Sequence, residues 1–441
     1  IGFFMQGLDT TIINTAIPAI AHSLNEDPLS MHSVVVAYVL SVAACIPLSG
    51  WLADRFGVRN TFFAAIVIFT FASLGCAFSS SLNELLTYRV IQGIGGAFLL
   101  PVGRLAMLKI IPRTQFLAAM SLMSLAGLIG PLIGPTLGGW MVEYMTWHWI
   151  FLINIPMGIL GVFVTFKAMP NVKETTVKKF DFSGFILLVF AMVGLSLGIE
   201  NLANKQSAAW VSIALIITGV VSTLIYAFHA ITHQNALFRA SLFKNRIFTI
   251  GILGNFFARF GGNALPFLLP LMLQVAFGFD PFITGLLMIP TVLGSLASKP
   301  IIRPLIQRFG YRQVLLINTL LVGVCIASFA LHTADTPTWF RLIHFFIFGV
   351  LNSLQFVSMN TLTLKDLSQQ NASSGNSFLS MIMMLSMSLG VALAGTLVNV
   401  FTQHLGTVHT LQAFNYTLLC LASINIIAAL IFWQIPKNTP I

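Results

Sequence analysis

Acidic residues are rare inside the apolar parts of this sequence, and one of them lies where proton chemistry is expected. Of twelve Asp and Glu residues, only Asp9 lies well inside a long apolar run, whereas Glu84, Glu143 and Glu200 lie near the ends of such runs. A low-dielectric environment favours the neutral form of a carboxyl group, and a nearby cation favours its charged form. A conformational change that alters either influence can load and release a proton, so Asp9 is the predicted proton-coupling residue.

Two basic residues, Arg89 and Arg259, also lie deep inside apolar runs. Because a charge in lipid is costly, such residues face a protein interior or a water-filled cavity and indicate function. We predict that Arg89 modulates Asp9 and that Arg259 contacts substrate, although an Asp9–Arg89 contact that only locks two helices is the alternative. Uncharged polar residues in these runs are predicted to bind substrate too, or else to bond across helices; they are Asn14, Gln92, Asn263, Gln274 and Gln355.

Sites for other chemistry are not indicated. His229 and His233 have the i, i+4 spacing of a metal-binding pair, but no acidic residue or thiol lies near them in sequence, so no metal site is expected. The four cysteines show no C-x-x-C spacing, and the sequence holds no G-x-x-x-x-G-K-[ST] phosphate loop. No combination of nucleophile and base is evident. We therefore expect that the protein is not an enzyme and has no cofactor. Its energy source is then expected to be an ion gradient or a partner.

The elements that must position these residues follow from composition. Hydrophobic residues make up 57% of the 441 residues and charged residues 8%, with a mean hydropathy of +0.91, far from the values of soluble domains. Continuous apolar runs of about 20 residues fit membrane-spanning helices and not the short alternating strands of a barrel. We predict an all-α membrane protein with fourteen transmembrane helices, at residues 1–22, 31–53, 60–79, 82–107, 114–143, 148–168, 182–201, 209–231, 246–275, 281–303, 312–332, 338–364, 374–402 and 411–434.

The distribution of Lys and Arg predicts the orientation. If the N-terminus is cytoplasmic, the cytoplasmic loops carry most of the basic residues, among them Arg59 and Arg312, and the opposite loops carry only Lys205. Anionic inner-leaflet lipids then explain the net charge of +10 without nucleic acid. We expect a multi-pass protein of the bacterial inner membrane with both termini cytoplasmic. Since the sequence begins inside an apolar run, we also expect a short segment to precede it.

An internal repeat predicts the domain organisation. Residues 47–59 (PLSGWLADRFGVR) and 300–312 (PIIRPLIQRFGYR) share Pro, Leu, Arg, Phe, Gly and Arg in register. Duplicated halves are typical of secondary transporters, which bind substrate between the repeats. The offset is too long for six helices, and two extra spans fill the excess. We expect a six-helix bundle at 1–168, a cytoplasmic linker with two extra transmembrane helices at 169–240, and a second six-helix bundle at 241–441.

Several segments resemble the signatures of one transporter superfamily. Residues 50–59 resemble the loop signature of the major facilitator superfamily, and residues 89–96 resemble its fourth-helix signature. Residues 127–139 are similar to the fifth-helix motif that marks its antiporters. Residues 8–18 and 147–156 resemble segments of its fourteen-helix drug:proton antiporters, and residues 358–367 and 372–377 resemble the MdtD-like exporters among them. The resemblance spans essentially the whole chain and implies the major facilitator fold, arranged as 6+2+6 helices.

The loop signature predicts a gate. Gly57 permits a tight turn, while charged residues beside it would close the cytoplasmic side; the predicted gating residues are Gly50, Asp54, Arg55, Gly57 and Arg59. The alternative is a solvated basic loop. The second copy has Gln307 where the first has Asp54, so a charge relay through that Asp is expected in the first half only.

The antiporter motif predicts a close helix contact. Glycines spaced four apart lie on one helical face, and the absence of side chains lets a neighbouring backbone approach. The motif residues are Gly127, Gly130, Pro131, Gly134, Gly138 and Gly139. The resemblance implies an interface that rocks without opening an ion leak, and ordinary helix packing is the alternative.

These patterns predict a proton-coupled antiporter that exports small molecules or drugs by alternating access and works as a monomer, with protons, substrate and membrane lipids as its partners. One deep acid against two deep cations is not the acidic excess expected of a specialist in organic cations. Anionic metabolites such as polycarboxylates, metal chelates or siderophores are therefore a second candidate substrate class. A non-transporting membrane sensor or scaffold is a third interpretation.

Overall fold

The computed structural model describes residues 1–110, 113–174, 179–203, 209–233, 235–367 and 369–436. Helices dominate these residues, and no β-strand is assigned among them. Contacts within the chain define two compact units. Unit 1 comprises Ile1–Phe185 with Asp280–Leu286, and unit 2 comprises Ile186–Phe279 with Leu287–Ile441. The three-part division at residues 168 and 240 stays a prediction.

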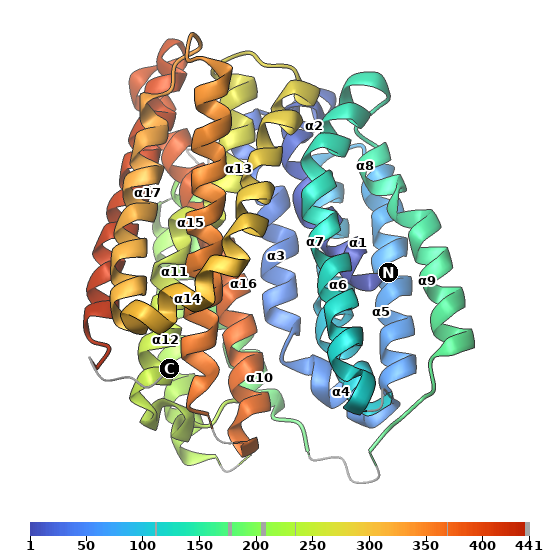
Figure 1. The fold of residues 1–441 in the computed structure, drawn as a ribbon. Helices are drawn as coiled ribbons and strands as arrows, with labels where there is room; N and C mark the ends of the chain where they lie inside the picture. The colour runs from blue at the N-terminus through green and yellow to red at the C-terminus, as the bar shows by residue number, and fades with distance from the viewer. Residues whose placement is uncertain (111–112, 175–178, 204–208, 234, 368, 437–441) are drawn as a thin grey trace. The chain divides into compact units, whose positions relative to one another are not determined.

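Unit 1 is a bundle of helices that runs from α1 to the start of α10 (Figure 1). Its elements are α1 (Gly2–Ile12), η1 (Ile13–Thr15), α2 (Ile17–Leu24), η2 (Pro28–Ser30), α3 (His32–Cys45), α4 (Leu48–Phe56), α5 (Val58–Ala77), α6 (Leu82–Ile110), α7 (Arg113–Tyr144), α8 (Trp149–Leu152), α9 (Asn154–Ala168) and the first turn of α10 (Phe182–Glu200).

Two spans predicted as continuous in unit 1 are interrupted. The segment 1–22 is divided into α1, η1 and α2, with a proline in the first turn of α2; proline is tolerated there because its missing N–H would have no helical partner. The segment 31–53 is divided at Pro47, so that α4 forms a short separate helix after α3 (Figure 1). Gly50, Asp54 and Arg55 therefore lie on a helix, and of the predicted gating residues only Gly57 lies in the turn itself.

Unit 2 contains the rest of α10 and the helices up to the C-terminus (Figure 1). Its further elements are η3 (Asn201–Ala203), α11 (Ala209–Thr232), η4 (Ala240–Lys244), α12 (Arg246–Phe257), α13 (Arg259–Val275), α14 (Pro281–Ser328, shared with unit 1 at its start), η5 (Phe329–Leu331), α15 (Thr338–Lys365), α16 (Gln369–Leu405), η6 (Thr407–His409) and α17 (Thr410–Trp433).

Unit 2 also departs from the predicted spans at two places. The segment 246–275 is interrupted at Ala258, directly before Arg259. The predicted spans 281–303 and 312–332 run together as α14, which bends where Gly310 takes φ 72° and ψ 161°. Only glycine adopts this backbone conformation at low cost. Gly310 thus makes the same sharp turn in the second repeat that Gly57 makes in the first.

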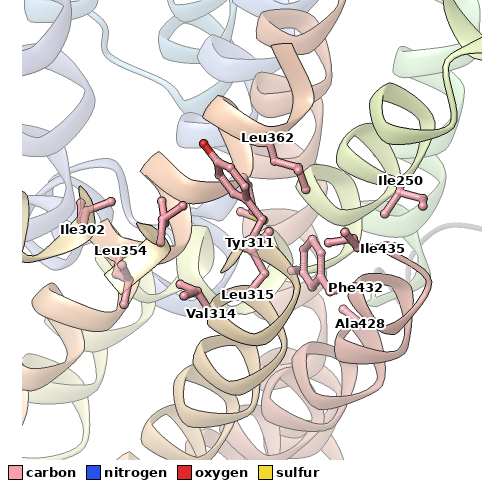
Figure 2. Packing of buried hydrophobic residues seen from close by; sticks show 13 residues of the cluster. Ile250, Ile302, Tyr311, Val314, Leu315, Leu354, Leu362, Ala428, Phe432 and Ile435 are labelled. Atoms are coloured by element: carbon pink, nitrogen blue, oxygen red, sulfur yellow. The ribbon is translucent and has the colours of Figure 1, made fainter. Parts of the chain in front are cut away.

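A hydrophobic cluster packs around this bend in unit 2 (Figure 2). Leu315 and Phe432 are fully buried in it, and Tyr311 and Leu362 lie beside them. Lipid is as apolar as these side chains, so their gain comes from close packing between helices more than from the removal of apolar surface from water. The cluster fixes the second half of α14 against α12, α15 and α17.

The described helices include eleven stretches that are long and apolar enough to cross a membrane. One of them, Pro281–Leu331, contains two of the predicted spans. Within the stretch Ala209–Thr232 on α11 only 22% of the residues in the apolar window are buried in the protein, which fits a helix that faces lipid. The number fourteen stays a prediction, and Lys205 lies outside the described residues.

Candidate functional site

The predicted pair of Asp9 and Arg89 forms an ion pair inside unit 1. Arg89 Nη1 on α6 donates to Asp9 Oδ2 on α1 at 2.8 Å. Both side chains are buried, with 1% of Asp9 and none of Arg89 exposed to solvent. A charge-assisted bond of this length in a water-excluded site is strong, and either partner left alone would be an uncompensated buried charge.

The other carboxylate oxygen of Asp9 is bound by uncharged side chains. Gln92 Nε2 donates to Asp9 Oδ1 at 2.8 Å, and Asn154 Nδ2 on α9 donates to the same oxygen at 3.4 Å. Gln92 also accepts from Arg89 Nη1 at 2.7 Å and donates to Ser73 Oγ on α5 at 2.8 Å. The network therefore joins α1, α5, α6 and α9 around one carboxylate. Gln92, predicted to bind substrate, is one turn after Arg89 and belongs to this network.

The cation of the pair is held from its other side by α3. The Arg89 guanidinium lies 4.3 Å from the centre of the Tyr38 ring, a cation–π contact. Arg89 Nε donates to the Val34 carbonyl at 3.2 Å. Three buried atoms around the pair have no hydrogen-bond partner within the described part of the chain, namely Arg89 Nη2, the Tyr38 hydroxyl and Asn154 Oδ1. These atoms leave hydrogen-bonding capacity unused around the ion pair.

The glycines of α7 bring that helix into backbone contact with α1, which carries Asp9. A Cβ on Gly130 would lie 2.6 Å from the Leu8 nitrogen, and one on Gly134 or Gly138 would collide with Thr11 or the Ile12 carbonyl. Thr15 Oγ1 donates to the Pro135 carbonyl at 3.2 Å. Gly127 and Pro131 lie on the same face, against Phe3 and Gly7, and Gly139 instead contacts Pro281. The glycine motif thus determines how closely the helix of the ion pair is held.

The turn between α4 and α5 is covered by the chain segment that follows α9. Gly57 takes φ 90°, and a side chain there would collide with Asn171. Val58 N donates to the Val172 carbonyl at 3.1 Å, and Glu174 N donates to the Asp54 carbonyl at 3.2 Å. On α4, Trp51 packs against the Phe180 ring with centroids 5.2 Å apart.

The remaining gating residues lie around this turn. The Arg55 guanidinium lies 5.1 Å from the Trp51 ring, and that of Arg59 lies 5.6 Å from the Phe166 ring. Gly50 has open space beside it. The two arginines are therefore fixed by aromatic rings at the turn.

In unit 2, Arg259 is a buried cation with uncharged partners. Arg259 Nε donates to Asn255 Oδ1 at 2.9 Å and Nη2 donates to Asn360 Oδ1 at 3.0 Å. Its guanidinium lies 4.2 Å from the Phe356 ring, and 5% of the residue is exposed. No carboxylate among the described residues lies within 4.0 Å of it. A buried guanidinium bound only by amides retains the capacity to bind an anion.

The other predicted substrate-binding residues lie in both units: Asn14 in unit 1, and Gln355, Asn263 and Gln274 in unit 2. Gln355 donates to Thr319 Oγ1 at 2.6 Å and accepts from Asn318 Nδ2 at 2.7 Å, which makes it part of a helix-to-helix contact. Asn14 is buried in η1, and its Oδ1 atom has no partner within the described ranges. Asn263 and Gln274 are half-buried on α13.

A profile described as the Major Facilitator Superfamily matches residues 1–390 and 251–440. The chain belongs to the major facilitator superfamily. Its profile matches together cover both repeats, and the helices of both units make it a multi-pass membrane protein. The expected major facilitator fold is confirmed, and the superfamily points to a transporter and not to an enzyme.

Several relatives of this chain are named putative multidrug resistance protein MdtD. The MdtD protein of Salmonella dublin is 51% identical over 443 residues, which cover 99% of this chain and 94% of that protein. The MdtD protein of Escherichia coli O6:H1 is 51% identical over 445 residues, which cover 99% of this chain and 93% of that protein. The resemblance to the MdtD-like exporters is therefore confirmed.

Two solved structures illustrate the shared fold. A D-xylose-proton symporter has a TM-score of 0.69 at 16% identity, with 99% of this chain and 96% of that chain covered. A bacterial homologue of the human lysosomal transporter Spinster has a TM-score of 0.70 at 14% identity, with 98% and 94% covered. At such identities the likeness concerns the fold alone.

Sequence reasoning missed several residues of this major facilitator site. Asn154 and Ser73 complete the Asp9 network, and Asn255 and Asn360 hold Arg259. A further cation, Arg104, lies half-buried on α6 with its guanidinium 5.8 Å from the Phe3 ring. Asn255 lies four residues before Arg259, a spacing that in the predicted continuous helix 246–275 would put both on one face, and this was a usable signal.

Proposed function

We propose that this chain is a proton-coupled antiporter that exports small molecules, drugs among them, across the inner membrane by alternating access. The Asp9–Arg89 ion pair carries the proposal, because it is a fully buried acid bound to a cation that could replace a proton. The names of the MdtD relatives support export of drugs. The fold supports a two-state transporter built from repeats.

Proton coupling follows from competition at the Asp9 oxygens. Protonation removes the negative charge that the Arg89 bond needs, so a proton and the ion pair exclude each other. Breaking the pair releases α6 from α1, and Gln92 can bond to either form of the carboxyl because its amide both donates and accepts. The charge of Asp9 is thereby linked to the packing of four helices.

The transport cycle uses this linkage. In the cytoplasm-open state Asp9 loses its proton and substrate enters. After the units rearrange, a periplasmic proton neutralises Asp9 and substrate leaves. Proton and substrate then disfavour each other's binding, and the coupling works equally in both directions. Gly130 and Gly134 support a role in this step, because without side chains there α7 and α1 meet at backbone contact.

The remaining assignments rest on the same framework. The basic loops support cytoplasmic termini and contact with anionic lipids, and the turn at Gly57 supports a cytoplasmic gate because the segment after α9 covers it. We propose that Asn14, Asn263 and Gln274 contact substrate. We also propose that the chain acts as a monomer.

Purified protein in liposomes with an imposed pH gradient tests the coupling. Wild type is expected to transport a cationic dye such as ethidium against the gradient, whereas Asp9→Asn is expected to lose at least about 100-fold of gradient-driven transport while still binding the dye. The exposed acid Asp335→Asn is the matched control and should transport normally. Gradient-driven transport by Asp9→Asn at the wild-type rate would refute Asp9 as the coupling site. If wild type transports neither cationic dyes nor polycarboxylates, the result would favour a sensor or scaffold.

Arg259 supports a second candidate substrate class. A buried guanidinium with only amide partners fits an anionic group such as a carboxylate. We infer that polycarboxylates or metal chelates such as siderophores are alternative substrates. The same liposomes discriminate them: a preference for polycarboxylates over cationic dyes that Arg259→Gln abolishes would support the anionic class.

A further inference from the structure

A basic pocket lies at the C-terminal end of α11, within unit 2, and contains none of the residues assigned a role above. Its volume is about 540 Å³, within the range of sites that hold small molecules. The residues that give it its chemistry are Ile231, Thr232, His233, Arg239, Ser241 and Lys244. The pocket is formed where the chain after α11 folds back to reach η4.

Buried contacts hold the wall of this pocket in place. The Phe238 backbone nitrogen donates to the Tyr226 hydroxyl at 3.0 Å, which ties the returning segment to α11. The Phe238 ring is 3% exposed and packs on Phe378 with centroids 4.9 Å apart, and Phe243 packs on the same ring at 5.4 Å. Arg239 and Lys244 are therefore carried by an anchored segment and lie on the same wall before any ligand binds.

The polar part of the pocket suits a phosphate group. Arg239 supplies a planar guanidinium and Lys244 an ammonium, and both are exposed. The Ser241 hydroxyl adds a donor, and no acidic residue belongs to the described lining of the pocket. Guanidinium, ammonium and hydroxyl groups together form the donor set that binds phosphate oxygens in proteins.

The apolar side of the pocket continues along α11. Ile231 lines the pocket and is 73% exposed, Phe228 is 69% exposed and Leu224 is 64% exposed. Residues three and four apart share one face of a helix, so these three form a continuous apolar strip that leads away from the cations. An amphiphile with a phosphate head and a hydrocarbon tail matches both parts, whereas free phosphate matches only the first.

We propose that this pocket binds the phosphate headgroup of an anionic glycerophospholipid, with one acyl chain along the strip of Ile231, Phe228 and Leu224. Basic pockets at the ends of membrane helices attract anionic lipids electrostatically. The lipid would fasten the returning segment to α11 and would keep one of the two extra helices in place. This site is independent of the Asp9 network and of the direction of transport.

Native mass spectrometry of the full chain in detergent tests the proposal. The probes are phosphatidylglycerol, phosphatidylcholine and inorganic phosphate. Wild type is expected to bind phosphatidylglycerol more tightly than phosphatidylcholine, and the double variant Arg239→Gln with Lys244→Gln is expected to bind it about tenfold more weakly. Arg303→Gln with Arg308→Gln removes the same charge from exposed positions outside the pocket and should keep wild-type binding.

A charge-preserving variant and the phosphate probe distinguish a lipid site from misfolding and from a simple anion site. Arg239→Lys with Lys244→Arg keeps the charge and should retain binding, which excludes loss of folding as the cause. Equal binding of the two lipids, or an equal loss in the Arg303 and Arg308 control, would overturn the site. Binding of inorganic phosphate as tight as that of phosphatidylglycerol would overturn the lipid assignment, because the acyl strip would then contribute nothing.

Discussion

Arg89 in unit 1 and Arg259 in unit 2 are both buried, and the partners of these two arginines differ. Arg89 in unit 1 is neutralised by Asp9 at 2.8 Å. Arg259 in unit 2 is bound by two asparagine side chains and by an aromatic face, with no carboxylate within 4.0 Å among the described residues. In the first arrangement the two charges balance, and the proposed mechanism has it change when a proton binds. The second retains a positive charge, which can attract an anion.

The difference suggests a division of labour between the repeats. A buried pair is costly to split because the partner left behind keeps its charge in a low-dielectric site. For a buried cation bound by amides, hydrogen bonds within its own unit already offset the free-energy cost of removing the charge from water. We infer that unit 1 binds and releases the proton and that unit 2 selects substrates by their charge.

Removing each arginine in turn is the strongest way to break this comparison. Arg89→Gln leaves Asp9 as an unpaired buried acid and is expected to destabilise the protein by about 3–5 kcal/mol. Arg259→Gln leaves only amides that can bond to the new amide, and the expected loss is about 1 kcal/mol. The thermal midpoints of the purified variants in detergent measure both effects.

The double variant Asp9→Asn with Arg89→Gln is the decisive control for that experiment. It replaces the ion pair with neutral amides in the same network, so most of the lost stability should return even though proton coupling does not. If Arg89→Gln and Arg259→Gln lower the midpoint equally, the contrast between paired and unpaired cations has no energetic basis.

The sequence predicted the ion pair but not its surroundings. Asp9 and Arg89 could be paired because charged residues are so rare in the apolar runs. Asn154 and Ser73 could not be assigned, because uncharged polar residues occur throughout such runs and only the packing of α5, α6 and α9 selects these two. Gln355 was predicted to bind substrate or to bond across helices, and it bonds to Asn318 and Thr319.

The positions of the helix breaks could also be predicted only in part from the sequence. Pro18 and Pro47 marked two of them, whereas nothing in the local sequence marks the interruption at Ala258. The sharp turns at Gly57 and Gly310 were visible because the repeat places a glycine at both.

These two turns offer a second, smaller contrast between the repeats. Alanine at either glycine must adopt a positive φ with an extended ψ, a conformation almost confined to glycine, which costs about 1–3 kcal/mol. At Gly57 the new Cβ would also collide with Asn171, whereas nothing lies within 4 Å of the corresponding position at Gly310. Gly57→Ala is therefore expected to cost about 2 kcal/mol more than Gly310→Ala. Thermal midpoints of the two variants measure the difference.

A compensating change sharpens this second contrast. Asn171→Gly removes the side chain that the new Cβ would meet, so in the Gly57→Ala background it should bring the midpoint close to that of Gly310→Ala. A midpoint for Gly57→Ala that already equals that of Gly310→Ala would mean that the segment after α9 does not hold the turn.

The smallest expected contrast concerns histidines in the loops of the two units. In unit 2, His332 Nε2 lies 2.8 Å from His344 Nδ1, and Arg341 is nearby. Burial, then the neighbouring His344 and Arg341, lower the pKa of His332 to about 4. In unit 1, His148 stacks on the Trp147 ring, and burial alone lowers its pKa.

A lowered pKa means that the folded state of unit 2 binds its proton less readily than the unfolded chain. The contribution of His332 to stability is therefore complete above its ordinary pKa of about 6.5 and is lost as the pH falls from there towards 4. The thermal midpoint of wild type should fall over this range, and His332→Gln should flatten that fall. His148→Gln should flatten it less, and the exposed His409→Gln should leave it unchanged. A slope that His332→Gln does not alter would mean that the proton binds elsewhere, and the loop of His332 would then be no more sensitive to acid than the loop of His148.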